Sequence, residues 1–151
     1  MTDIVIREME RKDIPRLCEI ENACFSRPWT AEGFEAELDR ETAHFFVAQI
    51  DGVTAGYMGF HSVLDEGYIA NIAVLPRYRR MGAASRLLDN AFEKSRKLGL
   101  SFLSLEVRKS NEAAIELYRR YGFETVGERK NFYSSPTENA LIMTAYFDKK
   151  D

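Results

Sequence analysis

The segment that most constrains this chain is an apolar strand followed by a basic turn and an amphipathic helix. Residues 68–75 read as a buried strand, which Pro76 ends because proline cannot donate a hydrogen bond to a strand ladder. Apolar residues then recur at the spacing of one helical face, at Ala84, Leu87, Leu88, Ala91 and Phe92. A strand that leads into a helix through a short turn is typical of an α/β architecture.

The turn between strand and helix is basic and contains glycine, with the sequence RRMGAAS from Arg79 to Ser85. The first N–H groups of a helix have no intrahelical partner, and the helix dipole favours negative charge there. Gly82, Ala83 and Ala84 would let a phosphate approach the backbone closely. The turn therefore predicts a phosphate-bearing ligand, although a solvated basic loop before an ordinary helix has the same pattern.

Similar periodicities cover the rest of the chain. Further strands are expected at residues 4–6, 45–50, 54–61, 100–107, 123–130 and 140–147. Further helices are expected after residues that can cap a helix N-terminus, namely Asp13, Thr30, and Ser110 or Asn111. Turn signals lie at Asp51-Gly52 and at residues 65–67.

This order of elements predicts an α/β fold with a mixed central sheet of about seven strands and helices on both faces. A chain of 151 residues without repeats, low-complexity tracts or linkers is expected to form one domain, residues 1–151. The sequence leaves the oligomeric state open, and a monomer is compatible with it.

The composition narrows the function classes. A net charge of -3 disfavours a dedicated nucleic-acid-binding domain, which is usually basic. No apolar run is long enough to span a membrane and the N-terminus lacks a signal-peptide pattern, so a cytoplasmic location is expected. Cys18 and Cys24 have no His or Cys partner at metal-binding spacing; we expect reduced, partly buried thiols and no metal site.

These features together resemble the GNAT family of acetyltransferases. In that family an arginine or glutamine, two variable residues, a glycine, one variable residue, and a glycine or alanine bind the pyrophosphate of acetyl-CoA. The matching positions here are Arg79, Gly82 and Ala84. The resemblance extends over essentially the whole chain and implies acetyl-CoA as co-substrate, without a metal.

A closer resemblance is to the RimI branch, whose members acetylate the N-terminal alanine of a small-subunit ribosomal protein. The matching segments are LEVR at 105–108, SN at 110–111, AAI at 113–115, LY at 117–118, YGF at 121–123 and RKNFY at 129–133. One departure lies in the short segment 134–139, where an acidic pair common in the branch is replaced by Glu138-Asn139.

The resemblance implies roles for individual residues on the acetyl-CoA side. The cofactor-binding set is Ile72, Ala73, Val74, Arg79, Arg80, Met81, Gly82, Ala83, Ala84, Ser85, Asn111 and Tyr118. In this set the strand 72–74 would align the pantetheine arm and polarise the thioester carbonyl through its backbone. The same strand would also fit as a plain buried strand.

The resemblance implies that Glu106 is the general base. A strand period of two places its side chain on the face opposite Leu105 and Val107. An α-amino group has a pKa of about 7.7–8.0, so a carboxylate that accepts its proton would assist attack. The alternative is a strand glutamate paired with Arg108 or another cation. Tyr118 is the candidate general acid for the departing thiolate, and the alternative is a tyrosine that only packs on its helix.

Trp29 and Tyr133, with Phe25 as a further candidate, are expected to form the wall for an acceptor peptide, unless they are core residues. His44 and His61 receive no role. Two other functions stay open. The first is a GNAT enzyme for a lysine side chain, a small-molecule amine or a broader set of protein N-termini. The second is a non-catalytic acyl-CoA-binding module.

Overall fold

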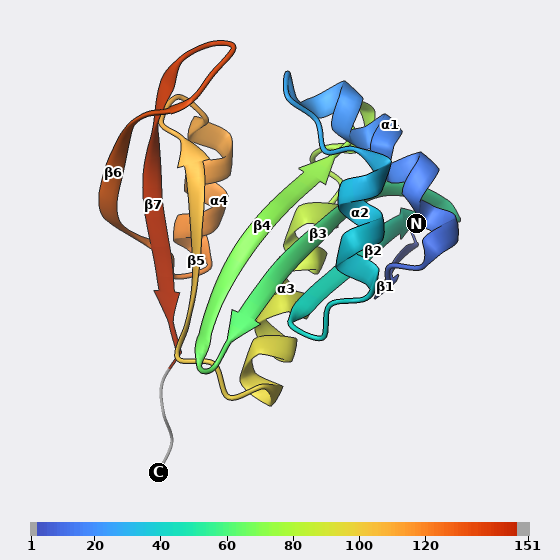
Figure 1. Cartoon of the computed structure of the whole chain (residues 1–151), viewed down its shortest axis with the longest axis horizontal. Coiled ribbons are helices and arrows are strands. Elements are labelled where there is room, and N and C mark those ends of the chain that lie inside the picture. Colours follow the sequence, from blue (N-terminus) through green and yellow to red (C-terminus); the bar gives the residue numbers. More distant parts are fainter. Residues whose placement is uncertain (1–2, 148–151) are drawn as a thin grey trace. The chain divides into compact units, whose positions relative to one another are not determined.

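A seven-stranded mixed sheet with the order β1-β2-β3-β4-β5-β7-β6 forms the centre of the computed structural model, which describes residues 3–147 (Figure 1). The strands are β1 (Ile4–Glu8), β2 (Ala43–Ile50), β3 (Val53–Val63), β4 (Glu66–Val74), β5 (Phe102–Arg108), β6 (Glu124–Tyr133) and β7 (Glu138–Tyr146). The helices are α1 (Ile14–Cys24), α2 (Ala31–Leu38), α3 (Ala83–Lys97) and α4 (Glu112–Arg120), with short 3-10 helices η1 (Arg11–Asp13) and η2 (Pro76–Tyr78). The predicted order of strands and helices is confirmed.

Strand directions follow the connections between the strands. The β1–β2, β2–β3, β5–β7 and β6–β7 pairs are antiparallel, whereas β4 and β5, which α3 connects, are parallel. A parallel pair needs a crossover connection, and the 15-residue helix α3 supplies it. The predicted α/β class with a mixed sheet is therefore confirmed.

The described residues divide into two compact units. The first unit comprises residues 3–61 and 70–94, and the second comprises residues 62–69 and 95–147. The prediction of a single domain over residues 1–151 is not tested by this division. Each unit is described by itself below.

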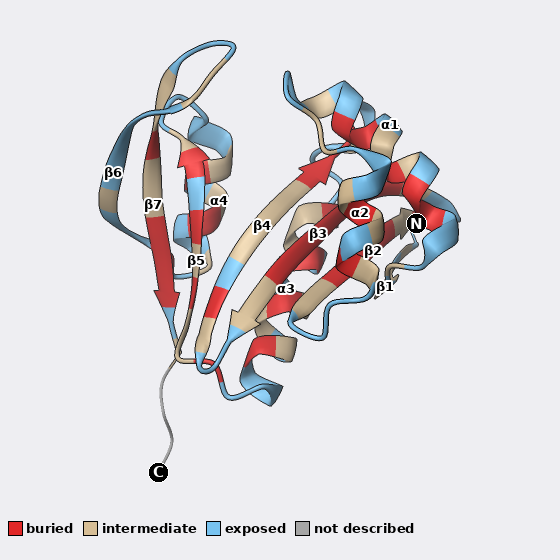
Figure 2. Ribbon diagram, viewed as in Figure 1, coloured by how far each residue is buried: buried red, intermediate tan, exposed pale blue. Residues whose placement is uncertain are grey.

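In the first unit, strands β2 and β3 are buried on both faces (Figure 2). One face carries Phe45, Val47 and Tyr57, which pack in a single cluster with residues of α1 and α2. Alternate residues such as Phe46 and Met58 are also buried, on the opposite face, where Figure 1 shows α3. Burial on both faces explains the nearly continuous apolar sequence of these two strands.

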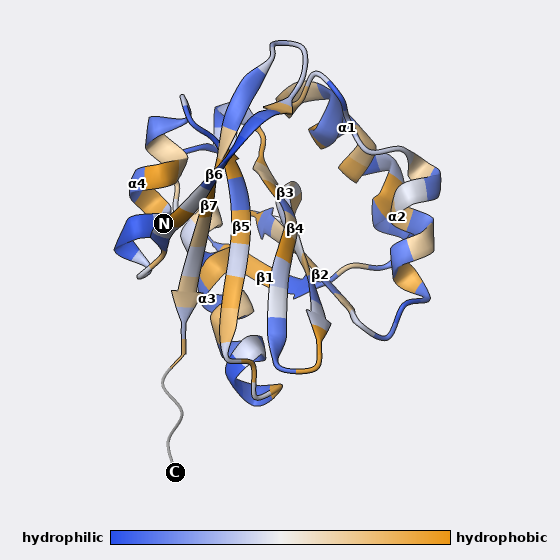
Figure 3. Cartoon of the chain, turned by 60° about the vertical axis from the view of Figure 1, so that its left-hand side comes forward, coloured by the Kyte–Doolittle hydropathy of each residue, from blue (hydrophilic) through white to orange (hydrophobic). Residues whose placement is uncertain are grey.

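In the second unit, α4 covers one face of β5 and β7 (Figure 1). Its core consists of Leu103, Leu105, Val107, Ile115, Tyr118, Ala140, Met143 and Ala145, all buried. Strand β6 is the edge strand of the sheet order and is mostly exposed, and Figure 3 shows that it is largely hydrophilic. Charged residues on an edge strand discourage pairing with another chain.

The turn expected at residues 65–67 was placed too late. The observed turn is at Leu64 and Asp65, and both Glu66 and Gly67 already belong to β4. Leu64 takes the left-handed conformation, with φ of 56°, in this turn. A glycine is needed at position 67 because the strand has no room there for a side chain. A Cβ would lie 2.7 Å from Leu103 Cδ2 and 3.0 Å from the Phe102 carbonyl oxygen.

The expected caps have mixed outcomes. Asn111 and Thr30 cap α4 and α2, because their side-chain oxygens accept hydrogen bonds from the N–H groups of Ala114 and Gly33. The prediction that Asp13 caps α1 through its side chain was wrong. Its carboxylate instead accepts two hydrogen bonds from Arg7, at 2.9 and 2.7 Å.

The other turn predictions agree with the structure. Asp51 and Gly52 have φ values of 48° and 85°, as a two-residue hairpin turn requires. Strand β4 ends at Val74, shortly before Pro76. No helix among residues 3–147 combines the length and the apolar character needed to cross a membrane.

We predict that Gly67→Ala lowers the free energy of unfolding by about 1–3 kcal/mol, because the added methyl group must displace Leu103, Leu100 or the Phe102 backbone. Urea denaturation measures the change. The matched control is Gly127→Ala, another strand glycine of the second unit, where the nearest atom to a Cβ is Ile142 Cδ1 at 3.4 Å. Equal stability of the two variants would contradict the packing role of Gly67.

Candidate active site

The turn that leads into α3 contains two residues in the left-handed conformation. Arg80 has a φ of 64° and Gly82 a φ of 94°. A Cβ at Gly82 would only come within 3.8 Å of Ile4 Cδ1, so glycine is needed there for the backbone conformation rather than for space. The first α-helical hydrogen bond of α3 runs from Arg86 N–H to the Gly82 carbonyl at 3.0 Å. The N–H groups that precede Arg86 lie in the turn where the sequence predicts the anion.

The Arg79 side chain stabilises this turn by contacts with neighbouring elements. Its Nε donates to the Val74 carbonyl oxygen at 3.0 Å, and an Nη nitrogen lies 3.6 Å from the Cys24 Sγ. Arg79 therefore connects the turn with the end of β4 and the end of α1. Arg80, Met81 and Gly82 are exposed, while α3 begins with the buried Ala83.

The strand segment 72–74 has two backbone groups that are bonded to side chains. The N–H of Ile72 donates to Asn71 Oδ1 at 3.0 Å. The carbonyl of Val74 accepts from Arg79 Nε and also from the Cys24 thiol at 3.5 Å. Side-chain bonds at both ends thus hold the backbone of this segment.

A buried carboxylate, Glu21, lies at the centre of a hydrogen-bond network in the first unit, which the sequence analysis missed. Glu21 is fully buried and accepts hydrogen bonds from Trp29 N–H at 2.8 Å, from the Tyr57 hydroxyl, and from Asn71 Nδ2 at 2.8 Å. Asn71 Nδ2 also donates to the Tyr57 oxygen at 2.9 Å. The network joins α1, the loop before α2, β3 and β4.

The electrostatics of this network follow from its burial. Burial raises the pKa of the Glu21 carboxyl, and hydrogen bonds from Trp29 and Tyr57 oppose that shift. Burial, followed by the neighbouring Glu21, also raises the pKa of the Tyr57 hydroxyl. One sequence signal could have indicated the site: Glu21 lies four residues after Leu17 on the apolar side of α1, where an unpaired carboxylate would be very unfavourable.

Trp29 packs on the core of the first unit. Its ring centroid is 5.3 Å from that of Phe34 and 5.8 Å from that of Phe45, and Trp29 is half-buried. Trp29 was expected either to contact the acceptor peptide or to belong to the core, and its observed contacts are those of a core residue. Phe25 is more exposed, at 38%.

In the second unit, Glu106 lies where the strand periodicity predicted. Its neighbours Leu105 and Val107 are buried, whereas the Glu106 side chain is 34% exposed. Its carboxylate is 3.5 Å from Arg129 Nε on β6. The pairing considered between Glu106 and Arg108 is not the one observed, because Arg108 forms its ion pair with Glu138.

Tyr118 and Tyr133 belong to the same unit as Glu106, and Tyr133 lies close enough to Glu106 to feel its charge. Tyr118 is buried against Phe123, with 5.6 Å between ring centroids; burial, and then Tyr133, raises the pKa of its phenol. Burial and then the negative charge of Glu106 raise the pKa of Tyr133 to about 12. The second unit thus contains a partly exposed strand carboxylate and two phenols whose raised pKa values keep them protonated at neutral pH.

The two cysteines lie in or at the end of α1. Cys18 and Cys24 are free and half-buried, and burial raises the pKa of both thiols. A thiol with a raised pKa has little thiolate at neutral pH. Across residues 3–147, no group of His, Cys, Asp and Glu side chains could hold a metal ion.

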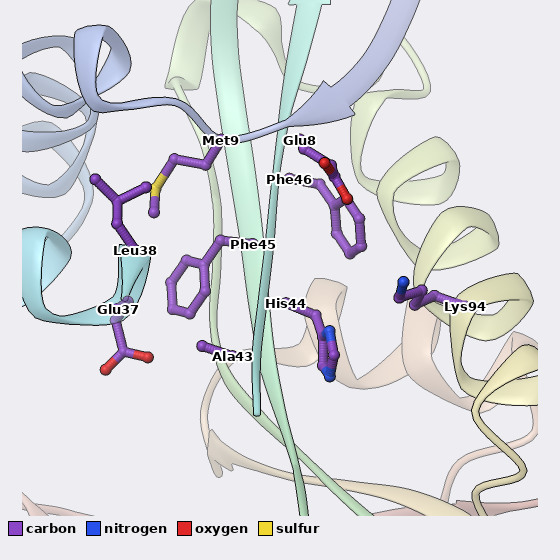
Figure 4. Close-up of a pocket in the computed structure, with 9 residues that line it drawn as sticks. All are labelled: Glu8, Met9, Glu37, Leu38, Ala43, His44, Phe45, Phe46 and Lys94. Atoms are coloured by element: carbon purple, nitrogen blue, oxygen red, sulfur yellow. The ribbon is translucent and has the colours of Figure 1, made fainter. Parts of the chain in front are cut away.

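A hollow elsewhere in the first unit does not form a site of its own. Its lining consists of Glu8, Met9, Glu37, Leu38, Ala43, His44, Phe45, Phe46 and Lys94. Figure 4 shows Glu37 and Phe45 on one side of β2 and His44 and Lys94 on the other. Burial, followed by the positive charge of Lys94, lowers the pKa of His44, and no shared ligand position follows from this arrangement.

A glycine-containing turn at a helix N-terminus and a partly exposed carboxylate on a strand are both compatible with an enzyme that transfers an acyl group from a phosphate-bearing carrier. The family model of the acetyltransferase (GNAT) family matches residues 14–123, and the chain belongs to this family.

Individual relatives are similar over nearly the whole chain. A protein of Bacillus subtilis, provisionally named ribosomal protein bS18-alanine N-acetyltransferase, is 41% identical over 94% of this chain and 95% of its own length. The enzyme of that name from Escherichia coli K12 is 36% identical over 91% of this chain and 94% of its own length. The crystal structure of the E. coli ribosomal-protein-S18-alanine N-acetyltransferase has a TM-score of 0.91 and 33% identity, and covers 99% of this chain and 97% of that one.

We predict that the stability difference between wild type and Glu21→Gln depends on pH. Because the pKa of Glu21 is raised, the folded chain binds this proton more tightly than the unfolded chain. The stability that Glu21 contributes is therefore present below its ordinary pKa of 4.5 and declines as the pH rises above it. The wild type should lose stability relative to Glu21→Gln by about 1.4 kcal/mol for each unit of pKa difference.

Urea denaturation at a series of pH values from acidic to neutral measures this difference. The control is Glu19→Gln, which removes one negative charge from an exposed position on the same helix. A stability difference between wild type and Glu21→Gln that does not change with pH would contradict the raised pKa.

Proposed function

We propose that this chain transfers the acetyl group of acetyl-CoA to the α-amino group of a protein N-terminus, and that the acceptor is the N-terminal alanine of ribosomal protein bS18. The identity with relatives that bear this activity in their names, over more than nine-tenths of the chain, supports the acceptor. The observation that supports the chemistry is the partly exposed Glu106 carboxylate in the same unit as the protonated phenols of Tyr118 and Tyr133.

The first unit would hold the acetyl donor. The backbone N–H groups of residues 82–85 would bind the pyrophosphate of acetyl-CoA, with the exposed Arg80 adding positive charge. Arg79 would act mainly through the backbone, because its guanidinium is bonded to the Val74 carbonyl. Gly82 is essential to this arrangement, since its φ of 94° is poorly accessible to other residues.

The segment 72–74 would polarise the thioester carbonyl through a backbone N–H group. The Ile72 N–H already donates to Asn71, and the Leu75 N–H donates to the Ala55 carbonyl oxygen on β3. Because backbone groups alternate along a strand, the Ala73 N–H also faces β3, and the candidate donor within this segment is the N–H of Val74. A fixed donor aimed at a developing oxyanion contributes about 2.7–4 kcal/mol to transition-state stabilisation. The side-chain bonds at both ends of the segment would keep that donor in place.

The second unit would move the protons. As the amine nitrogen bonds to the carbonyl carbon and the C–S bond breaks, Glu106 takes the amine proton directly or through water. Its ion pair with Arg129 is partly exposed and therefore weak, so this pairing leaves the carboxylate available as an acceptor.

Tyr118 would donate to the departing thiolate. Its raised pKa keeps the phenol protonated at neutral pH, as an acid must be before it acts. A thiol has a pKa of about 8.5, well below that of this phenol, so Tyr118 would stabilise the thiolate mainly by a short hydrogen bond. Asn111, which caps α4, would bind the pantetheine arm through the part of its amide that the cap leaves unused.

The acceptor peptide would lie against Tyr133, with Trp29 in a supporting role because it packs on the core. We further propose that the chain acts as a single acetyltransferase domain and needs no metal. A ribosomal-protein acceptor also fits a cytoplasmic location.

A peptide panel tests the acceptor. Peptides that start with alanine and continue as bS18 does should release CoA in the presence of enzyme and acetyl-CoA. The same peptides with a blocked N-terminus should not. Turnover of the blocked peptides, or of free lysine and small amines in preference to the alanine peptide, would overturn the proposal.

We predict that Glu106→Gln lowers kcat by about 10²–10⁴-fold and leaves the KM for acetyl-CoA unchanged, because only proton removal is affected. The loss should be greatest at low pH, where the amine is mostly protonated. Steady-state rates of CoA release across a pH series measure it. Glu128→Gln, which removes an exposed carboxylate on β6, is the matched control. Parallel pH profiles for Glu106→Gln and wild type would exclude Glu106 as the base.

A further inference from the structure

We propose that Arg108 is a positioning residue for the acceptor peptide: it holds Tyr133 and the loop from Ser134 to Glu138, and thereby sets the affinity for the acceptor. This inference rests on the proposed function, in which Tyr133 contacts the peptide. Every residue involved lies in the second unit, at the end of β5 and in the connection between β6 and β7.

The guanidinium of Arg108 binds the loop at three points. One Nη nitrogen donates to the Ser134 carbonyl oxygen at 3.1 Å. The other donates to the Pro136 carbonyl oxygen at 2.9 Å and to Glu138 Oε1 at 3.2 Å. Loop carbonyls normally bond to water or to other backbone, so three bonds to one side chain fix the path of this short loop.

The same guanidinium also packs against the ring of Tyr133. The Arg108 Cζ lies 4.5 Å from the centre of the Tyr133 ring, within the range of a cation–π contact. An arginine can do both because its planar group offers donors at its edge and a face for stacking. A lysine at this position would keep the positive charge but could not make all of these contacts.

Glu138 attaches the far end of the loop to the same strand end. Its Oε1 pairs with Arg108, and its other carboxylate oxygen accepts from the Ser110 N–H at 2.6 Å. The side chains of Arg108 and Glu138 are only 28% and 19% exposed, so this pair is worth more than a surface ion pair. Glu138, the remaining carboxylate where the RimI branch has an acidic pair, is thus engaged within the chain and is not free for a substrate amine.

Arg108 lies on β5 close to the proposed base, Glu106. Arg108 is two residues from Glu106, so both side chains are on the same face of the strand. Glu106 and Arg108 also act on the pKa of Tyr133 in opposite directions: the carboxylate raises it and the guanidinium lowers it. Arg108 therefore fixes the Tyr133 ring near Glu106, and the carboxylate of Glu138 compensates the positive charge of Arg108.

The test compares Arg108→Gln and Arg108→Lys with Lys109→Gln. Lys109 is the next residue, and its exposed ion pair with Glu128 makes it a control for the loss of one positive charge. Both Arg108 variants should raise the KM for the alanine peptide by about ten- to a hundredfold, because small misplacements of substrate-positioning groups have effects of that size. The KM for acetyl-CoA should stay at the wild-type value, and Lys109→Gln should change neither.

A second measurement needs no substrate. Hydrogen exchange at the amides of residues 134, 135 and 137–139 should be faster in Arg108→Gln than in wild type or Lys109→Gln, while the amides of α4 stay protected. If Arg108→Gln does not fold, Glu138→Gln removes the carboxylate end of the same pair and should show the same exchange and KM pattern.

Unchanged exchange in the loop, or an unchanged peptide KM in folded Arg108 variants, would overturn the proposal. Equal increases in the KM values of peptide and acetyl-CoA would also overturn it, because they indicate a general structural defect. A wild-type enzyme that does not acetylate the alanine peptide would instead refute the proposed function. Exchange would then still decide whether Arg108 holds the loop.

Discussion

The buried carboxylate of Glu21 is the constraint on which the first unit depends. A carboxylate without water must be satisfied by protein donors, and here the donors come from the loop before α2, from β3 and from β4. Loss of a donor leaves part of a buried carboxylate unsatisfied, which typically costs about 1–3 kcal/mol or more, so these segments are held in one arrangement. Asn71, a member of the network, also binds the N–H of Ile72. The position of the β4 backbone therefore follows from a charge on α1.

The two units contribute different kinds of groups to the proposed chemistry: backbone groups in the first unit and side chains in the second. The first unit contributes backbone groups, and its side chains serve to hold them: Gly82 allows the turn, and Arg79 fixes it to Val74. The second unit contributes side chains whose burial sets their protonation, as the raised pKa values of Tyr118 and Tyr133 show. Substitutions in the first unit should thus act mainly on donor binding, and those in the second on rate and acceptor affinity.

The sequence predicted those features that local periodicity and local chemistry determine. The alternation along β5 correctly put Glu106 on the more exposed face, and Asn111 caps its helix as expected. Gly67 was misread because a glycine needed for close packing looks the same in sequence as one needed for a turn. Asp13 was misread because its partner Arg7 lies on the preceding strand. Glu21 was missed because its donors are spread from residue 29 to residue 71 and meet only in the folded chain.

The central claim is that this GNAT enzyme acetylates an α-amine, and tandem mass spectrometry of one product tests it most directly. The acceptor is a peptide with an N-terminal alanine and an internal lysine, so that both amines compete within one molecule. We expect fragments that carry the acetyl group on the alanine nitrogen and an unmodified lysine. Acetylation of the lysine with a free N-terminus would contradict it.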